Sequence, residues 1–145
     1  MDLRPATASD APRLTEVFLT ARATAMPWLA KPHDDEETAG WMASVVLPDL
    51  TVLVAEEDGD VAGFLALHDG WVEHLYVHPD AQGRGVGSLL LDAAVQRSPG
   101  PLQLHVFTRN TPARRFYERA GFRLVGQGDG SGNEEREPDC LYRRP

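Results

Sequence analysis

Val77-His-Pro-Asp-Ala-Gln-Gly-Arg-Gly-Val-Gly-Ser-Leu-Leu-Leu91 is the stretch that decides the fold of this chain. It follows an apolar run, Trp71 to Val77, which is rich in β-branched and aromatic residues and predicts a strand. After it, apolar residues recur at helical spacing, namely Val86, Leu89, Leu90 and Ala93. The sequence therefore predicts a strand, a glycine-rich turn and a helix in direct succession.

The turn carries glycine at alternate positions, Gly83, Gly85 and Gly87. Glycine has no side chain to obstruct the convergence of backbone N–H groups. Such a turn at the start of a helix binds anions, because the helix dipole adds about half a positive charge there. We therefore expect a phosphate ligand, most simply a pyrophosphate.

Two common nucleotide-binding loops are excluded. The turn has no Gly-Lys-Ser/Thr ending, as a P-loop requires. Its third glycine comes one residue too early for the dinucleotide fingerprint, and Pro99-Gly-Pro101 intervenes before any acidic residue that could close a second strand.

A second informative stretch is Asn110-Thr-Pro-Ala-Arg-Arg-Phe-Tyr-Glu-Arg-Ala-Gly-Phe122. Thr111 is the predicted N-cap of a short helix, Pro112 takes its first position and Gly121 follows its end. Ala113, Phe116, Tyr117 and Ala120 share one face, which on its own is typical of a core helix.

The two stretches together resemble the GCN5-related N-acetyltransferases (GNAT). Gln82-x-x-Gly85-x-Gly87, entered through His78-Pro79, resembles their acetyl-CoA loop. The later stretch resembles their downstream motif, with Asn before a helix, Phe-Tyr within it and Ala-Gly-Phe after it. The resemblance covers about residues 61 to 128. It implies acetyl-CoA as cofactor and transfer of its acetyl group to a primary amine of a small molecule or peptide by direct attack.

The remaining elements complete an α/β (α+β) fold in a single domain, residues 1–145. Ser9 is the expected N-cap of a first helix, and acidic residues 34–37 lead into a second. Asp58-Gly-Asp60 and Asp69-Gly70 predict tight hairpin turns. The resemblance implies a mixed, mostly antiparallel seven-stranded splayed sheet flanked by about four helices. Predicted strands are 2–6, 51–56, 61–67, 71–77, 102–107, 123–127 and 139–143.

The composition of the chain limits its possible binding partners and its cellular compartment. The chain has 145 residues, a formal net charge of −8 and one cysteine, Cys140. The acidic balance argues against nucleic acid, and no apolar run is long enough to span a membrane. One cysteine excludes an internal disulfide and a multi-cysteine metal site, and we expect no metal. These features and the absence of a signal peptide favour the cytoplasm. The sequence leaves the oligomeric state open, a homodimer included.

The resemblance assigns the cofactor contacts. It places the pyrophosphate on the turn, the pantetheine arm on strand backbone, and a cofactor-contacting asparagine at Asn110. A backbone N–H near Leu75 would polarise the thioester carbonyl. The expected cofactor-binding residues are Leu75, Tyr76, Val77, Gln82, Gly83, Arg84, Gly85, Val86, Gly87, Ser88 and Asn110.

Two residues are the expected catalytic groups. An alkyl ammonium with a pKa near ~10.4 needs a base, and Glu73 lies ~13 Å along its strand from Val77, towards the acyl end. Strict alternation places Glu73 on the face of Leu75 and Val77, and the rival base His74 on the face of Val72. Tyr117 resembles the family's tyrosine that protonates the departing thiolate.

The acceptor side is expected to involve the first two helices and the last hairpin. These contribute Trp28, His33, Trp41 and the acidic cluster Glu134, Glu135 and Glu137, which would attract a cationic amine. A solvated polar loop is an equal interpretation of that cluster. Two alternative functions remain: a non-catalytic acyl-CoA sensor of the same fold, and a transferase for a longer acyl-CoA.

Overall fold

The strand–turn–helix unit occupies the centre of the computed structural model, which describes residues 1–145. The strands are β1 (Asp2–Pro5), β2 (Thr51–Glu57), β3 (Asp60–His68), β4 (Trp71–Val77), β5 (Leu102–Phe107), β6 (Arg123–Gly128) and β7 (Asp139–Arg144). The helices are α1 (Ala11–Ala25), α2 (Asp35–Trp41), α3 (Leu47–Asp49), α4 (Val86–Arg97) and α5 (Thr111–Arg119). A π-helical turn at Met42–Val46 joins α2 to α3.

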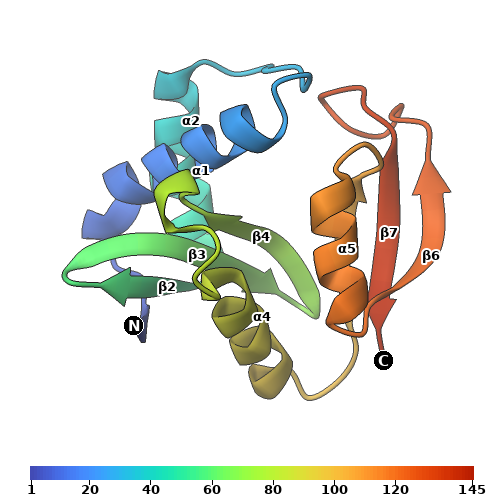
Figure 1. Ribbon diagram of the computed structural model, residues 1–145. Helices are drawn as coiled ribbons and strands as arrows, with labels where there is room; N and C mark the ends of the chain where they lie inside the picture. The colour runs from blue at the N-terminus through green and yellow to red at the C-terminus, as the bar shows by residue number, and fades with distance from the viewer.

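The strands form one seven-stranded sheet in the order β1-β2-β3-β4-β5-β7-β6. Every neighbouring pair is antiparallel except β4 and β5, which are parallel and pair only at Trp71 and Gln103. Beyond that point the two strands diverge, so the sheet is open like a V (Figure 1). The predicted mixed, splayed, seven-stranded sheet is thus confirmed.

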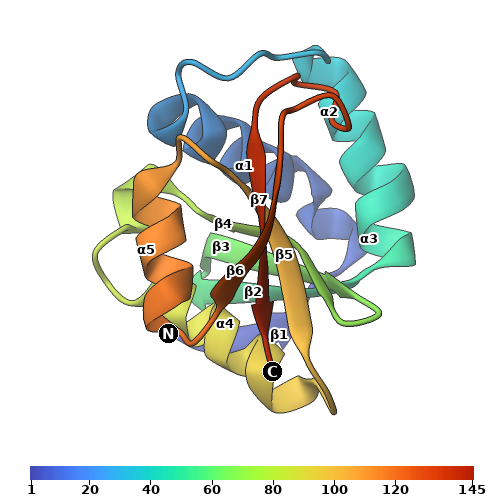
Figure 2. The same ribbon diagram turned by 90° about the vertical axis from the view of Figure 1, so that its right-hand side faces the viewer.

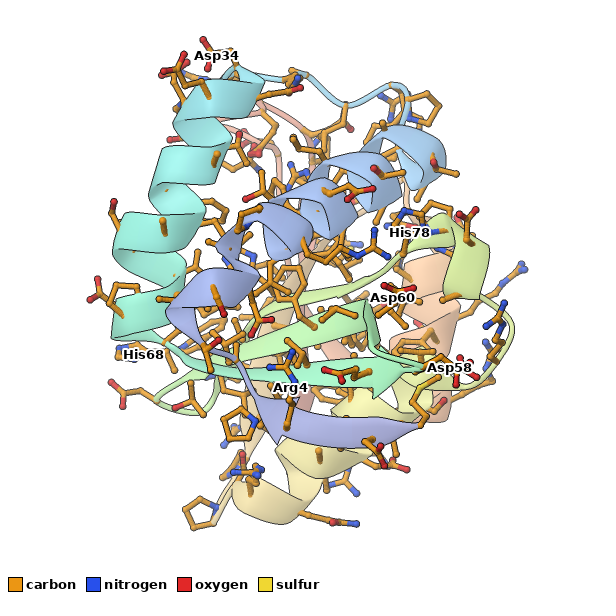
Figure 3. The ribbon with its side chains drawn as sticks, turned by 90° about the vertical axis from the view of Figure 1, so that its left-hand side faces the viewer. Arg4, Asp34, Asp58, Asp60, His68 and His78 are labelled. Carbon is orange, nitrogen blue, oxygen red and sulfur yellow. The ribbon has the colours of Figure 1, made fainter.

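Helices cover both faces of the sheet, with a separate core under each. On one face α1 and α2 cross the N-terminal strands (Figure 3), and ten buried residues, Phe64 and Met42 among them, form the core. On the other face α4 and α5 cover a core of eighteen buried residues, which includes Leu65 and Leu90. Strands β2 and β3 therefore send alternate side chains into the two cores.

Strict alternation along β4 proved wrong, because the strand contains a bulge. His74 pairs with Ala66 and Val72 pairs with Leu67, so Glu73 has no partner on β3. Val72 consequently packs in the same core as Leu75, although the sequence places these two on opposite faces. An extra residue in one strand shifts every later side chain by one position, and it leaves Glu73 outside the alternation.

Two predicted helix caps are also corrected. A 3₁₀ turn, Ala8–Asp10, precedes α1, and the Asp10 carboxylate accepts a hydrogen bond from the Thr7 N–H at 2.7 Å. Ser9 lies within this turn, and the N-cap residue of α1 is Asp10. At α5 the N-cap is Asn110, whose side-chain oxygen accepts from the Ala113 N–H at 3.4 Å. Thr111 is the first residue of that helix.

Substitution of Gly63 by Ala tests the close packing of β3 on β4. A Cβ at Gly63 would lie 2.8 Å from the Tyr76 carbonyl oxygen and 3.2 Å from Val86 Cγ1, so backbone has to shift. We expect Gly63→Ala to lower the free energy of unfolding by about 1–3 kcal/mol, measured by urea denaturation. Gly40 lies in α2 with nothing within 4 Å, so Gly40→Ala should raise it by about 0.5–1 kcal/mol. Equal effects at the two positions would contradict this account.

Candidate active site

The glycine-rich turn presents a row of free backbone amides. Gly83 and Gly85 adopt left-handed conformations, with φ of +81° and +79°, and Gly85 is the N-cap of α4. No N–H from Gly83 to Ser88 donates to an acceptor in the chain, and the first bonded amide of the helix is that of Leu89. A Cβ at Gly83 or Gly85 would meet nothing within 4 Å. These amides form a solvent-open cradle for an anion.

The edge of β4 that faces β5 continues from this cradle. Because β5 leaves β4 after Trp71 and Gln103, the backbone from Glu73 to Val77 has no strand partner on that side. The Gln82 side chain donates to the Val77 carbonyl at 3.4 Å, which ties the turn to the end of the strand. An extended ligand with amide groups would find unpaired hydrogen-bonding groups along this edge.

Helix α5 lies next to the start of α4, beside the amide cradle. A Cβ at Gly87 would lie 3.3 Å from Phe116 Cζ, so the missing side chain lets α5 approach the start of α4. Tyr117 is buried between Phe116 and Phe122, at ring-centroid distances of 5.2 and 5.8 Å. Burial, together with the nearby Tyr76 hydroxyl, raises the pKa of Tyr117. Its hydroxyl therefore stays protonated at neutral pH and is available as a hydrogen-bond donor.

A cavity of about 1,170 Å³ lies on the α1 and α2 side of the sheet. Four of the six residues expected on the acceptor side line it, namely His33, Trp41, Glu134 and Glu135. Trp28 does not line it; its ring packs against Phe107 at 6.4 Å and beneath the Arg109 guanidinium at 4.1 Å. Glu137 is also elsewhere, paired with Arg109 at 2.8 Å.

His74 lines this cavity and Glu73 does not. The imidazole contacts Phe18 and Trp41 edge-on, at centroid distances of 6.1 and 5.1 Å, and has no hydrogen-bond partner in the chain. Burial, reinforced by the charge of Arg22, lowers the pKa of His74 to about 4. At neutral pH it is an uncharged imidazole, whereas the Glu73 side chain is exposed to solvent.

Arg22 also lines this cavity, and the sequence analysis did not identify it as a site residue. Its Nη1 donates to the Tyr76 hydroxyl at 3.1 Å and its Nη2 to Glu135 Oε2 at 3.0 Å. The guanidinium carbon is 4.8 Å from the Phe18 ring centroid and 5.9 Å from that of Phe107. Arg22 thus contacts β4, β5 and the loop between β6 and β7. The sequence did contain one indication of this role: Arg22 lies four residues after Phe18, so it shares the apolar face of α1 that packs on the sheet.

A second polar contact joins the same two sides of the molecule. His33 Nε2 lies 2.8 Å from Glu134 Oε2, which connects the α1–α2 loop to the β6–β7 loop (Figure 2). The hydrogen bond to Glu134, with a smaller contribution from Glu37, raises the pKa of His33. Both side chains are exposed, so this contact lies at the rim of the cavity.

Comparison with known proteins identifies the class. The model of the "Acetyltransferase (GNAT) family" matches residues 14–122. The chain is 31% identical to the peptidyl-lysine N-acetyltransferase YiaC of Escherichia coli over 124 residues, which are 85% of this chain and 84% of YiaC. The chain belongs to the acetyltransferase (GNAT) family. It is also 30% identical to the E. coli L-amino acid N-acyltransferase MnaT over 142 residues, covering 88% of this chain and 82% of MnaT.

Solved GNAT structures share the fold. The structure of yncA, a putative acetyltransferase from Salmonella typhimurium with its cofactor acetyl-CoA, superimposes with a TM-score of 0.75. The identity is 23%, and the match covers 99% of this chain and 92% of that one. Membership confirms the predicted N-acetyltransferase class and the predicted cofactor, acetyl-CoA. The free amides of the turn and the open edge of β4 fit a pyrophosphate followed by an amide-bearing arm.

Two further properties concern other ligands and the membrane. No three His, Cys, Asp or Glu side chains are gathered in a way that would hold a metal ion. None of the helices combines the length and the apolar character that crossing a membrane requires.

The cradle is tested by Gly85→Val. A β-branched residue is strained at φ +79°, and its side chain would occupy the open space in front of the amides. We expect acetyl-CoA binding, measured by calorimetry, to be lost in a protein that remains folded by circular dichroism. Gly100→Val is the control, because Gly100 lies in a turn with nothing within 4 Å and no positive φ. Unchanged affinity in a folded Gly85→Val protein would overturn the assignment of the cradle.

Proposed function

We propose that this enzyme, acting as a single cytoplasmic domain, acetylates a primary amine of a small molecule or peptide. The observation that carries the proposal is the divergence of β4 and β5, which leaves the β4 edge open between the amide cradle and the cavity. A thioester bound along this edge and an amine bound in the cavity would meet in the cleft. The names of YiaC and MnaT make protein lysines and free amino acids candidate acceptors.

Backbone groups would hold the cofactor. The proposed contacts are the amides from Gln82 to Ser88 for the pyrophosphate, although that of Gln82 already donates to the Pro79 carbonyl at 3.4 Å. The backbone of Leu75, Tyr76 and Val77 is proposed to bind the arm. An N–H near Leu75 would polarise the thioester carbonyl, since that edge has no strand partner. Asn110 is expected to act more indirectly, because its side-chain oxygen already accepts from the Ala113 N–H and caps α5. When bound, acetyl-CoA supplies the activated acyl group.

Glu73 is proposed as the general base, acting through a water molecule. The bulge frees it from the packed faces of β4, and its side chain is exposed next to His74. His74 is the rival candidate, because it lines the cavity and its imidazole is uncharged at neutral pH. With Glu73 as the base, His74 would accept a hydrogen bond from the amine or from the water.

An acceptor screen tests the proposal directly. Purified protein and acetyl-CoA are combined with amines, amino acids and lysine peptides, and release of free thiol is measured. Transfer to at least one amine is the expected result. Binding of acetyl-CoA without transfer to any acceptor would instead indicate a non-catalytic sensor. The same assay is repeated with longer acyl-CoA donors. Faster transfer from one of these would correct the identity of the acyl group and leave the rest of the proposal intact.

Tyr117→Phe tests the proposed acid. The hydroxyl is protonated at neutral pH, and its loss would leave the thiolate without a proton donor. We expect turnover to fall about 10²–10⁴-fold while the affinity for acetyl-CoA, measured by calorimetry, is retained. Phe116→Leu, on the adjacent position of α5, controls for packing. A change in turnover of only a few-fold would show that Tyr117 is a core residue without a catalytic role.

Glu73→Gln and His74→Ala separate the two candidate bases through the pH–rate profile. If Glu73 is the base, Glu73→Gln removes the acidic limb of kcat/KM, and the rate recovers partly at high pH, where free amine accumulates. Because the pKa of His74 is about 4, this residue is already uncharged above pH 5, and His74→Ala should leave the profile between pH 5 and 9 unchanged in shape. If Glu73→Gln keeps the wild-type pH–rate profile and His74→Ala flattens it, the general base is His74 and not Glu73.

A further inference from the structure

The ion pair between Arg22 and Glu135 is placed inside the acceptor cavity. The two side chains come from α1 and from the β6–β7 loop, and both line the cavity. They are 3.0 Å apart, and their side chains are only 19% and 16% exposed. Most surface ion pairs are far more accessible to water, so the electrostatic effect of this one on a neighbouring ligand is comparatively strong.

Negative side chains outnumber positive ones in the lining of the cavity. The lining contains four carboxylates and two permanent cations, namely Asp35, Glu37, Glu134, Glu135, Arg22 and Lys31. Both cations are already paired, Arg22 with Glu135 and Lys31 with Asp35. A carboxylate that entered this cavity would therefore find no unpaired permanent cation, and burying it there would be costly.

Glu135 has spare hydrogen-bonding capacity. Its Oε2 accepts from Arg22, while its Oε1 accepts no hydrogen bond within the chain. A carboxylate offers about four lone-pair sites, so Glu135 can bind a second cation without releasing Arg22. Trp41 lines the same cavity and adds an aromatic ring that favours a cation.

We propose, on the basis of the function proposed above, that Glu135 selects the acceptor: a cationic amine with no carboxylate beside the reacting nitrogen. A lysine side chain within a peptide has this chemistry, whereas a free α-amino acid lacks it. An α-amino acid would place its carboxylate next to a guanidinium that Glu135 already neutralises. Glu135 therefore acts as a specificity-determining residue, and Arg22 positions it.

The experiment compares matched acceptors that differ only in the carboxylate. Tyramine and L-tyrosine form one pair, phenethylamine and L-phenylalanine another, and Nα-acetyl-lysine methylamide represents a peptide lysine. The kcat/KM of each is measured by thiol release with acetyl-CoA. For the wild-type enzyme we expect the kcat/KM of each amine to exceed that of its amino acid about tenfold or more, because only the amino acid brings a carboxylate into a cavity without an unpaired permanent cation.

Glu135→Gln should reduce or invert this ratio, because it removes the negative charge and leaves Arg22 unneutralised. Glu135→Asp keeps the charge and should keep the preference for amines. Glu137→Gln is the matched control: Glu137 lies in the same loop, is paired with Arg109 at 2.8 Å and is also 16% exposed, but it does not line the cavity. Its selectivity ratio should equal that of the wild type.

Binding of the same compounds in the presence of CoA, measured by calorimetry, separates the two proposals. If the amines bind more tightly than the amino acids but none is acetylated, the proposed function fails and the role of Glu135 stands. A wild-type preference for amino acids, an unchanged ratio in Glu135→Gln, or no binding of any amine would each overturn the role of Glu135.

Discussion

The single parallel bridge between β4 and β5 is the constraint on which the rest of the structure depends. Trp71 and Gln103 pair, Trp71 stacks on His105 at a centroid distance of 5.2 Å, and the strands then part. A continuous sheet would bury the β4 edge in hydrogen bonds to β5, and no ligand could reach it. Unpaired backbone groups are costly unless solvent or a ligand satisfies them. The divergence therefore creates both the binding edge and the chemical reason for a ligand to occupy it.

Contacts on both faces of the sheet keep the two halves at a fixed separation. On the α4 and α5 face, Phe116 packs against Gly87 and brings α5 next to the amide cradle. On the α1 face, Arg22 contacts Tyr76 on β4, Phe107 on β5 and Glu135 beyond them. Both contacts involve residues of the proposed site, so the groups proposed to bind ligands also keep the two halves of the sheet apart. Such coupling gives the precise placement that proximity catalysis requires.

Local sequence signals predicted the elements well and the cavity only in part. The bounds of β4 and β5 and the turns at Gly59 and Gly70 follow from periodicity and from residues suited to positive φ. The bulge at Glu73 was not predictable, because it depends on the register against β3 rather than on β4 alone. Trp28 was assigned to the acceptor side, but its contact with Phe107 arises only when the α1–α2 loop folds over β5. Arg22 was overlooked because its role depends on Glu135, which lies 113 residues later in the chain.

The Arg22–Glu135 pair is better explained by function than by stability. Removing two charges from water costs about as much as their attraction returns, and an apolar pair of similar size is often at least as stable. Phe18, Phe107 and Trp41 already supply apolar surroundings into which such a pair would fit. A charged pair in this position instead gives the cavity a defined electrostatic character: burial lowers the pKa of the His74 imidazole, and the charge of Arg22 lowers it further. One guanidinium thus adds to the burial that keeps His74 uncharged, donates to the Tyr76 hydroxyl and orients Glu135. These three effects make the chemistry of the cavity depend on a single side chain from the last turn of α1.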